Sequence, residues 1–102
     1  MKEDCLFCKI GNGDIESKIV YEDEYIIAFL DINPNNTGHT LVVPKKHILN
    51  LTDMDNETFV HINYSMKIVY DKLKKKLNFD GLQLSQNNGI LQEVKHYHIH
   101  MI

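Results

Sequence analysis

The sequence contains no arginine, so its eleven basic residues are all lysine. Any phosphate that the protein holds must therefore be bound by histidine, lysine, amide or backbone N–H groups, and not by a bidentate guanidinium. The formal net charge of −3 argues against a general nucleic-acid binder, because such proteins neutralise phosphates with a basic face. The absence of arginine and the negative net charge together favour an anion site built from histidines.

Long apolar runs are also absent. No segment approaches the ~20 apolar residues that a membrane helix needs, and the first residues, 1–4, lack the apolar stretch of a signal peptide. We therefore expect a cytoplasmic protein. The length of 102 residues, with 43% hydrophobic and 25% charged residues, indicates one small globular domain that is neither disordered nor fibrous.

Cysteine occurs only twice, as the C-x-x-C of Cys5 and Cys8. Without a secretion signal, a structural disulfide is less favoured than metal ligation or redox chemistry. A redox C-x-x-C usually opens a helix that follows a strand, and no strand is expected before Cys5. We therefore rate metal binding above the redox alternative.

The hydrophobic periodicity predicts helices and strands in a mixed order. Strands are expected where β-branched and aromatic residues cluster between turn-forming residues, and a long helix is expected from Asp55 as its N-cap. The predicted segments are a short helix over 5–10, strands over 19–21, 25–30, 40–43, 82–86 and 94–102, a loop over 31–38, and the long helix over 55–77. This order predicts an α+β domain with the long helix on one face of a five-stranded antiparallel sheet.

The long helix carries one apolar stripe, in which residues recur every three or four positions. Its members are Phe59, Ile62, Met66, Val69, Leu73 and Leu77. Beyond the stripe, Val60, Tyr64 and Ile68 widen the apolar surface past what one sheet covers. His61 lies outside the stripe and outside every motif, so no functional role is expected for it.

The last predicted strand carries three histidines at alternate positions, His96, His98 and His100. Alternate side chains of a strand project from one face, so the imidazoles share a side while Tyr97 and Ile99 face the core. A repeat of ~6.6 Å on each face brings neighbouring rings close enough to share a phosphate, or to divide between a metal and a substrate. Metal binding without catalysis is the alternative. A purification tag is disfavoured, because the interleaved residues are apolar.

Several motifs occur together and in order, and they span nearly the whole chain. They are the opening Cys5–Ile10, Phe29-Leu30-Asp31-Ile32, the run Gly38–His47, Asn87-Asn88-Gly89, and Gln92-Glu93-Val94 leading into the three histidines. With these motifs the chain resembles the histidine-triad (HIT) family of nucleotide hydrolases and transferases, in the branch similar to the Hint phosphoramidases. The resemblance implies a HIT-like fold with a single domain over residues 1–102.

The chain departs from the family pattern at three places. Only Ile90 and Leu91 separate Gly89 from Gln92, where relatives usually carry a longer, glycine-containing loop. Glu93 stands where serine or threonine is common. The chain ends at Ile102, directly after the triad strand, whereas relatives continue into a tail that helps to define the substrate.

The resemblance implies a division of roles around the triad. His98 takes the position of the nucleophile, which suits an imidazole because it both attacks phosphorus and leaves readily. His100 and His39 are flanking donors, and Asn87 and Gln92 donate to the non-bridging phosphate oxygens. The implied reaction is hydrolysis of purine nucleoside 5′-phosphoramidates through a nucleotidyl-histidine. Hydrolysis of dinucleoside polyphosphates, or a nucleotide- or zinc-binding module with little catalysis, are the alternatives.

The resemblance also implies how the nucleoside is held. Asp31 is expected to accept hydrogen bonds from the ribose hydroxyls. An apolar slot for the base is expected from Phe7, Ile10, Phe29, Ile32 and Leu41. Taken singly, each of these apolar residues is more often a core residue than part of a binding slot.

Two further expectations concern a metal and a partner. Cys5, Cys8, His47 and one triad histidine make a tetrahedral zinc set with two sulfur and two nitrogen donors. The resemblance identifies that histidine as His96, and such a closed site is structural. It also implies a homodimer that pairs through the long helix and an edge strand, which hides sheet edges that would otherwise aggregate.

Overall fold

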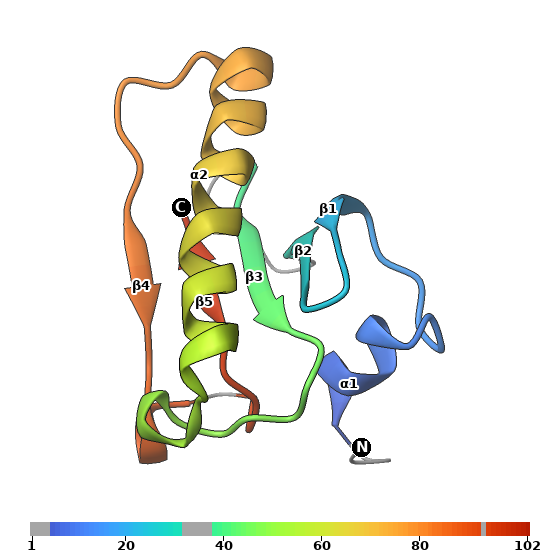
Figure 1. The fold of residues 1–102 in the computed structure, drawn as a ribbon. Helices are drawn as coiled ribbons and strands as arrows, with labels where there is room; N and C mark the ends of the chain where they lie inside the picture. Colours follow the sequence, from blue (N-terminus) through green and yellow to red (C-terminus); the bar gives the residue numbers. More distant parts are fainter. Residues whose placement is uncertain (1–4, 32–37, 93) are drawn as a thin grey trace.

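In the part of the chain that the structure describes, five antiparallel strands form one sheet, with a helix on each face (Figure 1). The computed structural model describes residues 5–31, 38–92 and 94–102. The elements are α1 (Leu6–Gly11), β1 (Ile19–Glu22), β2 (Ile26–Leu30), β3 (Thr40–Pro44), α2 (Asn56–Leu77), β4 (Leu84–Gln86) and β5 (Ile99–Met101). Short 3₁₀ turns lie at Leu51–Asp53 and Gly89–Leu91. The strand order is β1-β2-β3-β5-β4, which confirms the predicted fold class.

The two central strands β2 and β3 are buried on both faces, and alternate residues belong to different cores. Ile26, Ala28 and Val42 pack against α2, together with Tyr97, Ile99 and Met101. The intervening residues Ile27, Phe29, Leu41 and Val43 pack against α1. The strand period of two therefore assigns one sheet face to the long helix and the other to the amino-terminal helix.

Helix α2 has the termini that the sequence predicts. Asp55 is the N-cap, and its carboxylate accepts a hydrogen bond from the Thr58 backbone N–H. Asn78 ends the helix in the left-handed conformation, with φ of 50°. Among the described residues, no helix is long and apolar enough to cross a membrane.

The predicted apolar stripe of α2 is correct in its middle and wrong at both ends. Ile62, Val69 and Leu73 are buried, whereas Phe59 is 45% exposed and Leu77 is 40% exposed. A 22-residue helix is ~33 Å long, whereas a five-residue strand spans ~17 Å, so the ends of α2 extend past the sheet. The apolar residues of α2 therefore continue past the part of the helix that lies on the sheet.

The last strand is shorter than the predicted segment 94–102. The backbone of residues 94–96 bends, with the His96 N–H donating to the Val94 carbonyl, and Tyr97 donates to Ile48 beyond the end of β3. Ladder pairing with β3 begins only at Ile99. The alternation of faces nevertheless continues through the bend, because Tyr97 packs with Ile99 and Met101 in the core under α2.

The predicted fourth strand over 82–86 is likewise shorter, since β4 begins at Leu84. Gln83 and Ile102 exchange two backbone hydrogen bonds just beyond the strand ends, so the pairing of the two segments continues. The sequence pattern therefore places the pairing correctly and overstates the length of regular strand.

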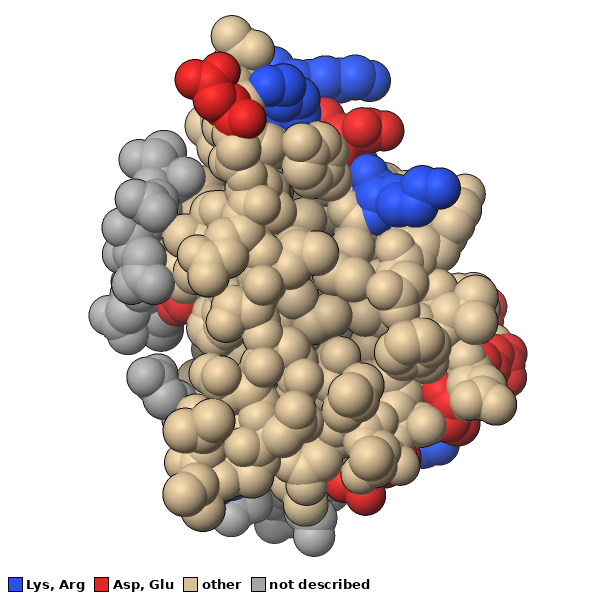
Figure 2. Space-filling model, turned by 90° about the vertical axis from the view of Figure 1, so that its left-hand side faces the viewer, with Lys and Arg blue, Asp and Glu red and all other residues tan. Residues whose placement is uncertain are grey.

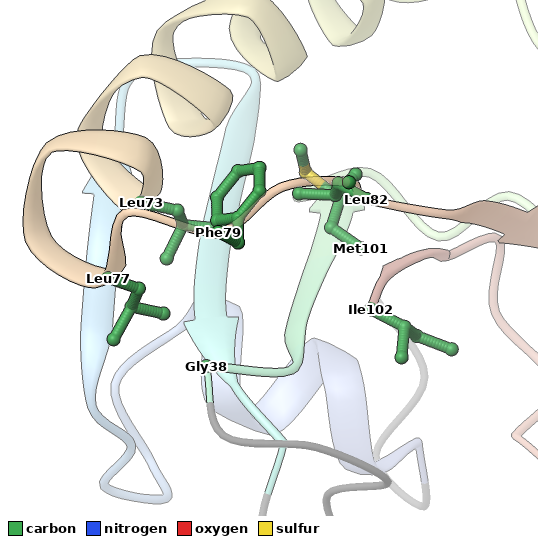
Figure 3. A pocket seen from close by; sticks show the side chains of 8 residues that line it. Gly38, Leu73, Leu77, Phe79, Leu82, Met101 and Ile102 are labelled. Carbon is green, nitrogen blue, oxygen red and sulfur yellow. The ribbon is translucent and has the colours of Figure 1, made fainter.

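A cavity of about 340 Å³ opens where the end of α2 passes the start of β3, between Leu73, Leu77, Phe79, Leu82 and the chain end (Figure 3). Gly38 lies at its floor with φ of +82°, a conformation that favours glycine. A Cβ atom at this position would clash with Leu77 Cδ1. Glycine at position 38 thus allows the chain to turn into β3 beneath the helix end.

Candidate functional site

His98 and His100 lie on the α1 face of the sheet, with Phe7 against His98. The Phe7 ring is 4.9 Å from the His98 ring, and the His98 and His100 rings are also 4.9 Å apart. His100 is held by pairing of β5 with β3, opposite Leu41. The structure therefore brings two of the three predicted catalytic histidines together beneath the amino-terminal helix.

One hydrogen bond fixes the orientation of the His98 ring. Its Nδ1 lies 2.7 Å from the backbone carbonyl oxygen of His96, which can only accept, so Nδ1 carries the proton. A neutral ring then keeps its lone pair on Nε2. Because His98 is 3% exposed and lines a pocket, Nε2 is the ring atom available to a substrate.

His39 lies immediately before β3, behind His100. Its Nε2 is 2.9 Å from His100 Nδ1 and 3.6 Å from a carboxylate oxygen of Asp31, and its side chain is 3% exposed. The backbone N–H of Asp31 also donates to the His39 carbonyl. His39 is absent from the pocket lining, so it contacts the expected donor His100 and not the pocket itself.

The pocket of about 190 Å³ beside His98 and His100 contains the predicted nucleoside residues. Its walls include Phe7, Ile10, Phe29 and Leu41, which are also buried in the core under α1, so these core residues line a pocket as well. Asp31 lies at its polar end with the two histidines. Ile32 lies outside the described residues, as does Glu93.

Sequence reasoning missed other residues of this pocket. They are Leu6, Ile15, Glu16, Ser17, Leu30 and Val94. The segment of Ile15, Glu16 and Ser17 joins α1 to β1 and carries no motif. Only the folding of α1 onto the sheet brings this connection to the pocket.

The two predicted amide donors do not line this pocket. The Gln92 side chain is buried and donates to the backbone carbonyl of Leu49. Asn87 lies between β4 and the following 3₁₀ turn and is half-buried, and its backbone carbonyl accepts from Gln86. In this arrangement Gln92 stabilises the segment after β3, and neither Asn87 nor Gln92 is among the residues that line the pocket.

A second cluster consists of Cys5, Cys8, His47 and His96, whose sulfur and nitrogen ligand atoms all lie within 4.8 Å of one another. His96 Nδ1 is 3.3 Å from Cys5 Sγ and 3.5 Å from Cys8 Sγ, and His47 Nδ1 is 3.2 Å from Cys8 Sγ. Tetrahedral zinc with Zn–S of ~2.3 Å and Zn–N of ~2.0 Å separates sulfur and nitrogen by roughly 3.5 Å. The donor set and its spacing fit this metal.

Burial lowers the pKa of His96 to about 4, although its hydrogen bond to the Pro44 carbonyl favours the protonated form. The ring is therefore neutral near pH 7. Its Nε2 lies 2.8 Å from the Pro44 carbonyl oxygen and donates to it, which leaves the Nδ1 lone pair facing the two sulfur atoms. A backbone carbonyl that fixes a ring in this way is a common partner of metal-binding histidines.

His61 lies apart from both clusters, as expected. Its half-buried ring stacks on Tyr25, just before β2, with centroids 3.9 Å apart. It therefore provides a histidine outside the site for control experiments.

Comparison with known proteins agrees with this geometry. The HIT domain family model matches residues 12–102. An uncharacterized HIT-like protein from Methanocaldococcus jannaschii is 51% identical over 100 residues, with 96% of this chain and 77% of the relative covered. An adenosine 5′-monophosphoramidase from Saccharomyces cerevisiae is 40% identical over 96% of this chain and 61% of its own length. The crystal structure of a HIT family member from Bacillus subtilis superposes with a TM-score of 0.93 at 42% identity, covering 98% of this chain and 72% of that chain.

The hydrogen bond from His98 to the His96 carbonyl predicts one tautomer in solution. Nitrogen-detected NMR at a pH where His98 is neutral should show Nδ1 as the protonated, pyrrole-type nitrogen and Nε2 as the unprotonated one. The same protein unfolded in urea provides the control, because its histidines should give tautomer-averaged shifts. A folded-state spectrum with the proton of His98 on Nε2 would contradict the assigned ring orientation.

Proposed function

The chain belongs to the HIT domain family, and on this basis we propose that it hydrolyses purine nucleoside 5′-phosphoramidates through a nucleotidyl-histidine on His98. The observation that carries the proposal is the placement of His98, whose Nδ1–H is held by a backbone carbonyl while its ring lines the pocket. The Saccharomyces cerevisiae relative, an adenosine 5′-monophosphoramidase, supports the substrate class.

The first step forms a bond between His98 Nε2 and the α-phosphorus. The P–N bond to the amine breaks, and the amine leaves with a proton donated by His100, whose ring lies beside that of His98. The nucleotidyl-imidazole that results carries a positive charge. The His96 carbonyl stabilises it, because it accepts the hydrogen bond from Nδ1–H at 2.7 Å.

The second step returns the enzyme to its starting state. Water attacks the α-phosphorus and gives one proton to His100, and the bond between phosphorus and Nε2 breaks. The product is the nucleoside 5′-monophosphate, and His98 is again neutral with its lone pair on Nε2. His39, which contacts His100 at 2.9 Å, holds that ring in place through both steps.

The nucleoside occupies the rest of the pocket. The ribose hydroxyls donate to Asp31, at the end of the pocket that also contains His100, and the base lies among Phe7, Ile10 and Leu41. An aromatic ring and aliphatic side chains suit the flat faces of a purine.

Replacement of His98 tests this mechanism most directly. His98→Ala removes the nucleophile, so turnover of an adenosine phosphoramidate should fall by ~10³-fold or more. Intact mass spectrometry should lose the nucleotidyl adduct that a slow substrate leaves on the wild type. AMP binding should persist, because the ribose and base contacts lie elsewhere.

His61→Ala provides the matched control and should keep both turnover and adduct. Near-normal turnover of the His98 variant, or an adduct that maps to His96 or His100, would overturn the assignment. Faster wild-type turnover of diadenosine polyphosphates than of the phosphoramidate would favour the dinucleotide alternative.

We further propose that the cluster of Cys5, Cys8, His47 and His96 binds a structural zinc ion. The support is the spacing and burial of the four donors, together with the neutral state of His96. Four protein ligands complete a tetrahedral shell, so the ion has no open position for substrate. Its effect is to link α1 with the segment after β3 and with the bend before β5, which supports the pocket wall that Phe7 provides.

Metal analysis of protein purified without chelators and freed of loosely bound ions should find about one zinc per chain. His47→Asn should lose that zinc and unfold at lower temperature, because an ion present at ~1,000 times its Kd stabilises the folded state by ~4 kcal/mol. His61→Asn should retain the zinc. A metal-stripped protein with unchanged thermal stability would contradict a structural role.

We also propose a homodimer through the face formed by α2 and the edge strand β4. Figure 2 shows this side of the molecule, where acidic and basic side chains lie at the margins and the middle is uncharged. The exposed apolar residues include Tyr64 at 61% and Leu84 at 53%. Strand β4 is an edge of the sheet, with one unpaired side that a second copy can cover.

A charge introduced into this face should prevent association. Sedimentation of the wild type at micromolar concentration should give twice the chain mass of 11.9 kDa, whereas Leu84→Lys should give the mass of one chain. Ile19→Lys is the matched control, because Ile19 is also 53% exposed but lies on β1 at the opposite edge of the sheet. A wild-type mass of one chain would refute the dimer.

A further inference from the structure

Asp31, His39 and His100 form a compact cluster of two imidazoles and one carboxylate at the polar end of the pocket. We propose that this cluster is a second metal site, which binds a divalent transition metal on the substrate side of the protein. It is separate from the cysteine-containing cluster, with which it shares no residue.

The distances between the donor atoms suit one ion. His39 Nε2 and His100 Nδ1 are 2.9 Å apart, and with metal–nitrogen bonds of ~2.1 Å this separation corresponds to an angle of ~90° at the metal. Asp31 Oδ2 and His39 Nε2 are 3.6 Å apart, which corresponds to ~120° for bonds of the same length. Both angles occur in five- and six-coordinate metal sites. The proton shared between the two rings moves to another ring nitrogen or to solvent when the ion binds.

The donor types and their exposure point to a transition metal with open coordination positions. Two histidines and one carboxylate on one side of an ion are a recurrent arrangement for iron, cobalt, nickel and zinc. His39 is buried, whereas Asp31 and His100 are partly exposed and line the pocket. An ion held by these three groups is therefore reached from the pocket, and water or another ligand completes its shell. With three ligands and no thiolate, it should bind more weakly than the four-ligand site.

The second metal site shares residues with the proposed reaction, and the competition between metal and nucleotide rests on the proposed function. Asp31 is the ribose acceptor and His100 the proton donor of the proposed reaction, and a bound metal occupies one atom of each. Metal and nucleotide then compete, and each lowers the affinity of the other by the same factor. A transition metal would therefore inhibit the enzyme by occupying the substrate pocket.

Cobalt(II) titration of metal-free protein distinguishes the two sites by their spectra. The first equivalent should produce the intense near-ultraviolet bands of thiolate-bound cobalt, from the cysteine-containing cluster. A second, weaker equivalent should add only faint visible bands without a further thiolate band. This second phase should be absent in His39→Gln and in Asp31→Asn, and unchanged in His61→Gln.

The thiolate bands of the first equivalent report whether each variant is folded. If His39→Gln does not form the thiolate bands, that variant is not folded, and the second phase of Asp31→Asn decides whether the second site exists. A wild type that takes up a single equivalent would overturn the second site. A second phase that persists in both variants would place the ion elsewhere and would also overturn it.

Addition of AMP tests the second metal site and the proposed nucleotide function separately. AMP should weaken the second cobalt equivalent at least tenfold and leave the first unchanged. If AMP binds without affecting the second phase, competition at Asp31 and His100 is refuted. If AMP does not bind at all while the second phase is present and sensitive to both variants, the metal site stands and the proposed nucleotide function fails.

Discussion

His96 is the residue on which the arrangement of the site depends, because it makes three different contacts at one bend of the chain. Its Nε2 donates to the Pro44 carbonyl at the end of β3, its Nδ1 faces the two cysteine sulfurs, and its backbone carbonyl accepts from His98. A displacement of this residue would disturb the cysteine-containing cluster and the His98 ring together. The bend before β5 is thus the point where the cysteine-containing cluster, the sheet and the pocket are joined.

The amino-terminal helix is important to the site because it also contacts His96. Helix α1 has six residues, too few to be stable in isolation. It is held by the burial of Phe7, Cys8 and Ile10 against the sheet, and by the contacts of its cysteines with His47 and His96. Phe7 contacts the rings of both His96 and His98. The helix therefore forms one wall of the pocket and also contributes to the cysteine-containing cluster.

The two faces of the sheet serve different purposes because a strand alternates its side chains. Tyr97, Ile99 and Met101 join the core under α2, which secures β5 within the sheet. His98 and His100 lie on the opposite face, where the short α1 leaves part of the surface open as a pocket. A longer helix on that face would bury the histidines, and a polar residue at position 99 would loosen the strand that carries them.

The resemblance supplied His96 as the fourth member of the cysteine-containing cluster, and only the fold brings it close to His47. The sequence by itself determined the order of the elements, the caps of α2 and the sides of the triad. These features follow from local periodicity, from capping chemistry, or from motifs that are contiguous in the chain. Only the tertiary structure decided that His39 lies behind His100, that Gln92 donates to Leu49, and that Phe59 and Leu77 are exposed. The connection at 15–17 also reaches the pocket only in the folded chain. Each of these depends on where segments distant in sequence come together and on how far the short sheet extends beneath a long helix, and no local pattern encodes either distance.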